Sequence, residues 1–170
     1  MDEKMMIRQF GLRLPVNFLI SVLLLSCSAS TPDTCKVVAD YYATYQAHDD
    51  FEKFMEFYDD KVVLEDMING DKVEGKEALR NFFNWSNPDL QKIGDDFMVV
   101  EEIIVEGNKA VAKGYFAPFK YGESEFEAMQ FTTILTFNDA GKIVRHVDWI
   151  NYPNTLVDYN TRKNSNEWLK

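Results

Sequence analysis

His146 and Asp148 are the residues whose types and spacing most plainly suggest chemistry in this chain of 170 residues. They lie in the alternating stretch from Gly141 to Ile150, which predicts a β-strand, and side chains two apart on a strand point to the same face, roughly 6–7 Å from each other. The rest of that face is apolar, since it also holds Val144 and Ile150. An imidazole beside a carboxylate in such a setting suits either acid/base catalysis or a purely structural ion pair.

A second carboxylate, Asp66, lies in a β-like run from Val62 to Met67. Burial raises the pKa of a carboxyl group and lowers that of histidine, whereas a neighbouring opposite charge does the reverse. If Asp66, His146 and Asp148 meet in one apolar cavity, one group could act as acid and another as base at neutral pH. The reaction would be proton abstraction next to a carbonyl, with rearrangement, cyclisation or loss of water. A register that turns these side chains outward would make them surface residues.

The elements that must position these residues follow from the spacing of apolar residues. Helical spacing predicts three helices, over Thr34–Ala47, Phe51–Tyr58 and Gly75–Trp85. Strand patterns then run over Phe97–Val105, Ala110–Tyr121, Glu127–Phe137 and Gly141–Ile150. Short turns between these long strands predict an antiparallel meander, and Pro118 predicts a bulge or bend in the second of them.

Three helices, one short strand and four long strands make an α+β pattern. A curved antiparallel sheet wrapped by the three N-terminal helices would form a cone-shaped barrel with a pocket inside. The many aromatic residues of the chain would be core or pocket wall.

The N-terminus has the features of a secretory signal. Three basic residues precede an apolar run from Phe18 to Leu25, which is too short for a comfortable membrane span. The following Leu24-Leu25-Ser26-Cys27 resembles a bacterial lipobox. We therefore expect a lipoprotein signal peptide over 1–26, lipidation of Cys27, a tether over 27–33, and attachment to the membrane of a bacterial cell envelope, facing the periplasm. The alternative is an ordinary signal peptide whose Cys27 pairs with Cys35.

The charge of the chain limits its partners. The net charge is −10, and loss of residues 1–26, which hold three basic and two acidic groups, would make it −11. A chain this acidic is a poor nucleic-acid ligand. The two histidines, His48 and His146, show no spacing typical of a metal site, so we expect neither a metal nor a cofactor.

Three segments resemble the nuclear transport factor 2-like superfamily, in its SnoaL-like and ketosteroid isomerase-like branches. They are Tyr58–Asp66, Val73–Phe83 and Phe137–Trp149. The resemblance implies a cone-shaped domain over 34–153, followed by a polar extension over 154–170, and a homodimer formed through the sheet. It does not imply one activity, because the superfamily holds isomerases, cyclases, dehydratases and many proteins that are not enzymes.

The resemblance assigns expectations to single residues. Asp66 falls where ketosteroid isomerases have the carboxylate that shuttles a proton, and Tyr42 falls near their oxyanion tyrosine. Thr133 stands where those isomerases have a second oxyanion acid, so the isomerase set is incomplete. Asp148 looks like the acid/base aspartate of SnoaL-like cyclases, with His146 beside it.

The pocket wall is expected to include Tyr42, Tyr45, Tyr115, Phe131 and Thr133. Trp149 has the opposite parity from Asp148, so it should pack under a helix or at a dimer face. The sequence predicts a lipid-anchored domain with a pocket for a small apolar ligand and no assignable activity. The alternative is an acid/base enzyme that uses Asp148, His146 and Asp66.

Overall fold

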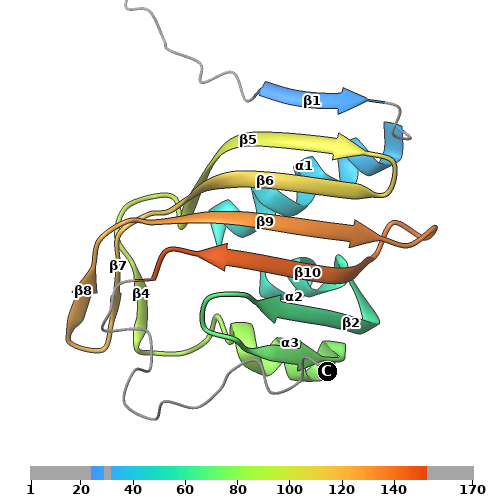
Figure 1. The fold of residues 1–170 in the computed structure, drawn as a ribbon. Helices are drawn as coiled ribbons and strands as arrows, with labels where there is room; N and C mark the ends of the chain where they lie inside the picture. Colours follow the sequence, from blue (N-terminus) through green and yellow to red (C-terminus); the bar gives the residue numbers. More distant parts are fainter. Residues whose placement is uncertain (1–23, 29–31, 153–170) are drawn as a thin grey trace, which may run out of the picture.

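The computed structural model describes residues 24–28 and 32–152 (Figure 1). In chain order the elements are β1 (Leu24–Ser28), α1 (Pro32–Ala47), α2 (Phe51–Glu56), β2 (Tyr58–Asp66), β3 (Lys72–Glu74), α3 (Lys76–Phe83), β4 (Leu90–Lys92), β5 (Met98–Glu106), β6 (Lys109–Phe116), β7 (Phe119–Tyr121), β8 (Ser124–Phe126), β9 (Met129–Phe137) and β10 (Ile143–Ile150).

One curved sheet organises the domain. Its seven strands lie in the order β1-β5-β6-β9-β10-β2-β3, and β4, β7 and β8 form a small second sheet at one end (Figure 1). The predicted meander is β5, β6, β9 and β10, and these strands pair antiparallel. The pairs β1–β5 and β10–β2 are parallel. The predicted α+β architecture is confirmed, with a sheet that curves without closing into a complete barrel.

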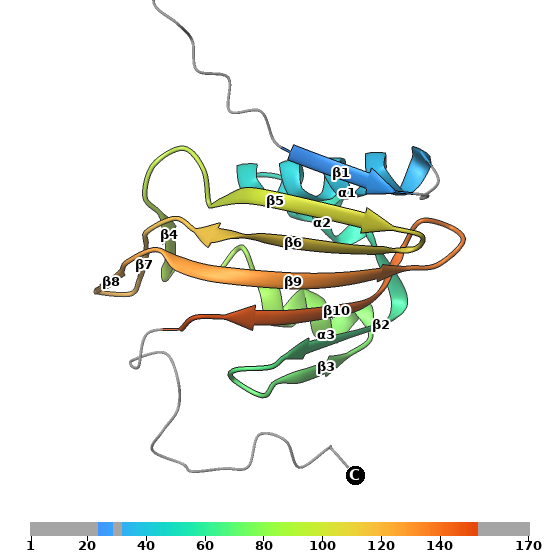
Figure 2. The same ribbon diagram turned by 45° about the horizontal axis from the view of Figure 1, so that its top comes forward.

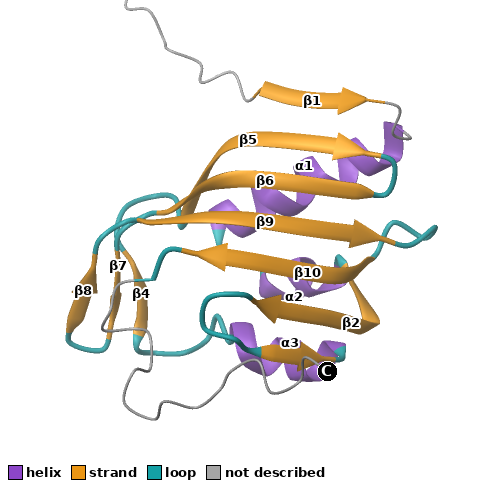
Figure 3. Cartoon of the chain, in the orientation of Figure 1, coloured by secondary structure: helices purple, strands orange, loops and turns teal. Residues whose placement is uncertain are grey.

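The three helices lie on the concave side of this sheet, whereas no described helix covers the opposite side (Figures 2 and 3). Helix α1 begins at Pro32, a residue favoured in the first turn because its missing N–H needs no partner there. Its predicted apolar stripe is buried, at Val38, Tyr41, Tyr42 and Tyr45.

The second helix is shorter than predicted. It is capped by Asp50, which accepts a hydrogen bond from the backbone N–H of Lys53, and it ends at Glu56. Tyr58 already belongs to β2, where it pairs with Ile143 of β10. Pairing with a distant strand overrides the helical spacing that Tyr58 has with the preceding residues, a preference that is weak by itself.

Two irregularities decide which side chains reach the interior. The predicted strand Ala110–Tyr121 breaks before Pro118 into β6 and β7, which confirms the expected bend. In β10 the register shifts between Ile143 and Arg145, so that Ile143 is buried while Val144 is partly exposed. The prediction that Val144 shares one face with His146 and Asp148 was therefore wrong. His146, Asp148 and Ile150 do face it.

The predicted signal peptide over 1–26 lies mostly outside the described residues, as does the extension over 154–170. No helix in the described part of the chain combines the length and apolar character needed to cross a bilayer. The predicted lipidation of Cys27 and its alternative, a Cys27–Cys35 disulfide, both concern a side chain that lies outside the described part of the structure.

Candidate functional site

Two carboxylates lie side by side at the inner face of the sheet. Asp66 ends β2 and is the ladder partner of Asp148 in the adjacent parallel strand β10. Neighbouring strands are about 4.8 Å apart, so side chains of such partners that face the same way are close neighbours. The two residues are 2% and 8% exposed, and both line one pocket. The strands β2 and β10 are far apart in the sequence, and their pairing brings the two acids together as predicted.

The pocket has a volume of about 170 Å³ and is partly open to solvent. Seven of the twelve described residues on its wall are aromatic, which favours a flat or apolar ligand. The wall consists of Tyr45, Asp66, Phe82, Phe83, Leu90, Phe97, Phe116, Phe119, Met129, Asp148, Ile150 and Tyr152.

Asp148 is held by residues of its own sheet. The Thr133 hydroxyl on β9 donates to its Oδ1 at 2.5 Å. His146 Nε2 lies 2.8 Å from its Oδ2, but that nitrogen has no well-aligned hydrogen-bond acceptor. The His146 contact is therefore a close approach without an aligned hydrogen bond, and Oδ2 keeps its capacity to accept a hydrogen bond.

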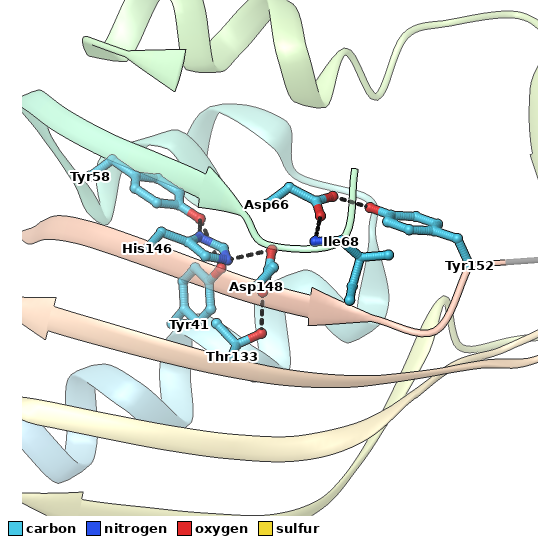
Figure 4. A network of polar contacts seen from close by, with 8 residues as sticks. All are labelled: Tyr41, Tyr58, Asp66, Ile68, Thr133, His146, Asp148 and Tyr152. Carbon is cyan, nitrogen blue, oxygen red and sulfur yellow. Dashed lines mark hydrogen bonds and ion pairs between the residues drawn. The ribbon is translucent and has the colours of Figure 1, made fainter. Parts of the chain in front are cut away.

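His146 lies behind Asp148 and does not line the pocket. It is 1% exposed, and its Nδ1 is 2.9 Å from the Tyr58 hydroxyl. That hydroxyl is in turn 2.8 Å from the hydroxyl of Tyr41 on α1. Figure 4 shows these side chains leading away from Asp148 into the core. His146 can therefore act on a ligand only through Asp148, which corrects its expected direct role.

Asp66 is held by the turn that follows it. The backbone N–H groups of Ile68 and Asn69 donate to its Oδ1 at 3.0 and 2.9 Å, and the Tyr152 hydroxyl donates to its Oδ2 at 2.5 Å (Figure 4). Burial raises the pKa of Asp66, these hydrogen bonds oppose the rise, and the charge of Asp148 adds to it. The net effect is a pKa above the ordinary value, because the cost of burial outweighs the hydrogen bonds.

Sequence reasoning missed Tyr41, Tyr58 and Tyr152 as parts of this site. Tyr41 was expected on the apolar stripe of α1 and as a candidate for the pocket wall, not as a hydrogen-bond partner of Tyr58, and Tyr58 was assigned to a helix. In β2 Tyr58 has the parity of Asp66, which would have placed it inward. Tyr152 follows the last strand, where no periodicity remains to indicate its direction.

The profile of the SnoaL-like domain family matches residues 38–146. The chain belongs to this family. No curated protein matches the sequence. The family match ends at His146, so Asp148 and Tyr152 of this SnoaL-like domain lie just beyond it.

Solved structures share the fold at low sequence identity. A protein from Shewanella denitrificans OS-217, described as a candidate SnoaL-like polyketide cyclase, has a TM-score of 0.60 at 17% identity, over 72% of this chain and 93% of that one. An NTF-2-like protein of unknown function from Burkholderia xenovorans LB400 has a TM-score of 0.55 at 19% identity, over 71% and 84%. A steroid delta-isomerase from Pseudomonas aeruginosa has a TM-score of 0.53 at 14% identity, over 75% and 86%. These likenesses show the fold, not an activity.

Of the residues predicted to line the pocket of the SnoaL-like domain, only Tyr45 does so. Phe131 and Thr133 are buried on the inner face of β9, where Phe131 packs against Phe116, but they lie behind the wall. The Tyr42 hydroxyl is also buried and has no hydrogen-bond partner. Burial and the charge of Asp148 raise the pKa of Tyr42 well above its usual value.

The placement of Tyr115 in the pocket was wrong. In β6 the inward residues are Ala112, Gly114 and Phe116, so the Tyr115 side chain lies on the opposite face. Gly114 is the ladder partner of Phe131, and this pairing sets the alternation. Trp149 is 39% exposed on the open face of the sheet and is not packed under a helix.

The described part of this SnoaL-like domain holds no cluster of metal-binding side chains. Within residues 24–28 and 32–152, no three His, Cys, Asp or Glu side chains are arranged to hold a metal ion. What the site offers is two adjacent carboxylates, an aromatic wall and the hydroxyl of Tyr45, a set suited to binding a small organic molecule and to moving protons.

Proposed function

We propose that this SnoaL-like domain binds a small, largely apolar molecule in the pocket, with one polar end against Asp66 and Asp148. The observation that carries the proposal is the combination of an aromatic wall with two adjacent carboxylates in one cavity. Ligand pockets are typically apolar with a few polar groups that fix orientation. No particular reaction is assigned.

A screen by thermal unfolding with small apolar compounds tests this proposal. Met129 lines the pocket, whereas the next residue, Gln130, is exposed on the other face of β9. Met129→Trp should fill the cavity, and Gln130→Trp serves as its control. We expect compounds that raise Tm for the wild type and for Gln130→Trp but not for Met129→Trp. Equal shifts in both variants would show binding elsewhere.

A second candidate is an acid/base enzyme in which Asp148 transfers a proton at carbon next to a carbonyl. It is favoured by the side chains behind Asp148, because Thr133 holds the carboxylate by a hydrogen bond, His146 lies 2.8 Å from it and Tyr58 holds His146. The Tyr45 hydroxyl on the pocket wall could stabilise a developing oxyanion.

Exchange of ligand C–H protons in D₂O, followed by NMR, tests catalysis without knowledge of the product. A compound found in the screen should lose its acidic C–H signal with the wild type but not with Asp148→Asn, while both proteins still bind it. Equal exchange rates with both proteins would rule out this role for Asp148. His146→Gln should slow exchange without weakening binding, because it acts through Asp148.

We also propose that the mature protein starts at Cys27 and is lipid-anchored in a bacterial cell envelope, on the strength of Leu24-Leu25-Ser26-Cys27. The intact mass of protein extracted from membranes decides between a diacylglyceryl group at Cys27 and a Cys27–Cys35 disulfide. A mass equal to the unmodified chain less two hydrogens would favour the disulfide. Cys27→Ser should release the protein from membranes only if the lipid is present.

A further inference from the structure

The charge of the pocket wall is one-sided. Asp66 and Asp148 both line the cavity, and among the described residues no lysine or arginine does so. The chain as a whole has a net charge of −10, which adds a field that attracts cations. An anionic group placed beside the two carboxylates would meet like charges in a poorly solvated site, and such an arrangement is unfavourable.

The hydrogen-bonding capacity of the wall is equally one-sided. An ionised carboxylate offers about four acceptor positions. Asp66 Oδ2 accepts one hydrogen bond, from Tyr152, and Asp148 Oδ1 accepts one, from Thr133. Asp148 Oδ2 has only the poorly aligned contact with His146. The wall therefore has acceptor positions on its carboxylates that no hydrogen bond fills. Of its two tyrosines, Tyr152 donates to Asp66, whereas the Tyr45 hydroxyl has no hydrogen-bond partner in the described part of the chain.

The aromatic rings of the wall supply the remaining complementarity. Tyr45, Phe97 and Phe116 lie within 6.1 Å of one another by ring centroid, and all three line the cavity. The faces of aromatic rings attract cations, and this attraction is strongest where water is excluded. The same rings provide apolar area for the substituents of a ligand.

We propose that the ligand of this pocket is an organic ammonium ion, a primary amine with an apolar or aromatic substituent. Its N–H donors bind the free acceptor positions of Asp66 and Asp148, and its substituent lies against the aromatic wall. The inference deepens the function proposed above and rests on it, since it names the chemical class that the same pocket accepts.

Isothermal titration calorimetry with three matched probes tests the inference. At pH 7, 2-phenylethylamine is a cation, 2-phenylethanol is neutral and phenylacetate is an anion, and all three carry the same ring on a short chain. We expect the amine to bind at least tenfold more tightly than the alcohol, and the carboxylate to bind most weakly. Asp66→Asn and Asp148→Asn should each weaken the amine about tenfold and leave the alcohol within about threefold, because one charge near a buried cation is worth about that much.

Asp139→Asn is the matched control, since Asp139 is an exposed acid in the turn before β10, and it should leave all three affinities unchanged. If the alcohol binds as tightly as the amine, the ammonium inference is wrong while the apolar pocket stands. If the amine binds but Asp139→Asn weakens it as much as Asp66→Asn, the attraction comes from the overall charge and the inference is again wrong. If no probe binds and Met129→Trp is also without effect in the compound screen, both the inference and the proposed function are overturned.

Discussion

At the scale of single residues, the burial of Asp66 makes the stability of the fold depend on pH. Burial raises the pKa of Asp66 above its ordinary value, so between that value and the raised one the folded protein binds more protons than the unfolded chain. Stability therefore falls as pH rises through this window and stays reduced at neutral pH. Such a cost is typical of groups retained for a function.

We predict that Asp66→Asn raises the free energy of unfolding at pH 7. The amide oxygen can still accept from Ile68 and Asn69, while the desolvated charge is gone. The gain should shrink as the pH is lowered toward 4, where the wild-type carboxyl takes up a proton. Urea unfolding at both pH values measures this, with Asp139→Asn as the control. A loss of stability of the same size at both pH values would contradict the explanation.

His48 shows the opposite dependence on pH. Its ring lies between those of Trp85 and Phe97, with centroids 3.9 and 4.0 Å away, and its Nε2 is buried without a hydrogen-bond partner. Burial and, to a smaller extent, Lys92 lower the pKa of His48 to about 4. A histidine that is neutral in the fold contributes stability that is complete above its unfolded pKa of about 6.5 and is lost as pH falls toward 4.

We predict that an NMR titration of His48 gives a pKa near 4. The associated loss of stability between pH 6.5 and 4 should be about 1–2 kcal/mol, after allowance for the partial solvent exposure of the ring. His48→Asn should abolish this part of the pH dependence, because asparagine does not titrate. Asparagine is the suitable replacement since it also tolerates the positive φ of 53° at this position. Titration of His48 near 6.5 would show that the ring is not held between its neighbours.

At the scale of elements, close pairing of β5, β6 and β9 sets the inner face. A Cβ atom at Gly114 would lie 2.1 Å from the Val99 carbonyl oxygen and 3.0 Å from the ring of Phe131. Because the nearer atom belongs to the backbone of a paired strand, the clash cannot be relieved by a side-chain rotation.

We predict that Gly114→Ala lowers the free energy of unfolding by about 2–3 kcal/mol, the usual cost of inserting a group into a packed interior. Lys113→Ala changes the adjacent exposed residue and should cost less than about 0.5 kcal/mol. Chemical denaturation of both variants measures the difference. Equal stabilities would mean that β5 and β6 can separate at this point without cost.

At the scale of the whole molecule, one face of the sheet is left open. An apolar row crosses β5, β6, β9 and β10 on that face. Each member is the ladder partner of the next, from Ile104 through Val111 and Ile134 to Val147. Ile104 is 46% exposed. We propose that this face forms the homodimer expected from the sequence, since an apolar row with one exposed and two half-buried members suits an interface, although Val147 is already buried.

We predict that the protein is a dimer by light scattering and that Ile134→Lys makes it monomeric. Ile134 lies in the middle of the apolar row, so a charge there would be buried without a partner in a dimer. Glu127→Lys, at an exposed position before β9, controls for the change in charge and should remain dimeric. A wild-type monomer at all concentrations would refute the proposed interface.

The sequence by itself determined the elements and their inner faces wherever the pattern is local. The stripe of α1, the meander, the bend before Pro118 and the shared face of His146 and Asp148 all follow from periodicity and from the missing N–H of proline. It did not determine the register, so Val144 and Tyr115 were assigned to the wrong face. The bulge in β10 displaced Val144, and the pairing of Gly114 with Phe131 set the faces of β6. Neither feature can be read from the sequence of one strand alone.

Only the tertiary structure decided the composition of the site. The Asp66–Asp148 partnership arises where β2 and β10 lie parallel, and the Tyr152–Asp66 hydrogen bond joins residues 86 positions apart. The sequence had included His146 in the pocket, whereas the fold places it behind Asp148, bonded to a tyrosine that local spacing had assigned to a helix. Contacts between distant segments depend on how whole elements pack, and periodicity within one element carries no information about them.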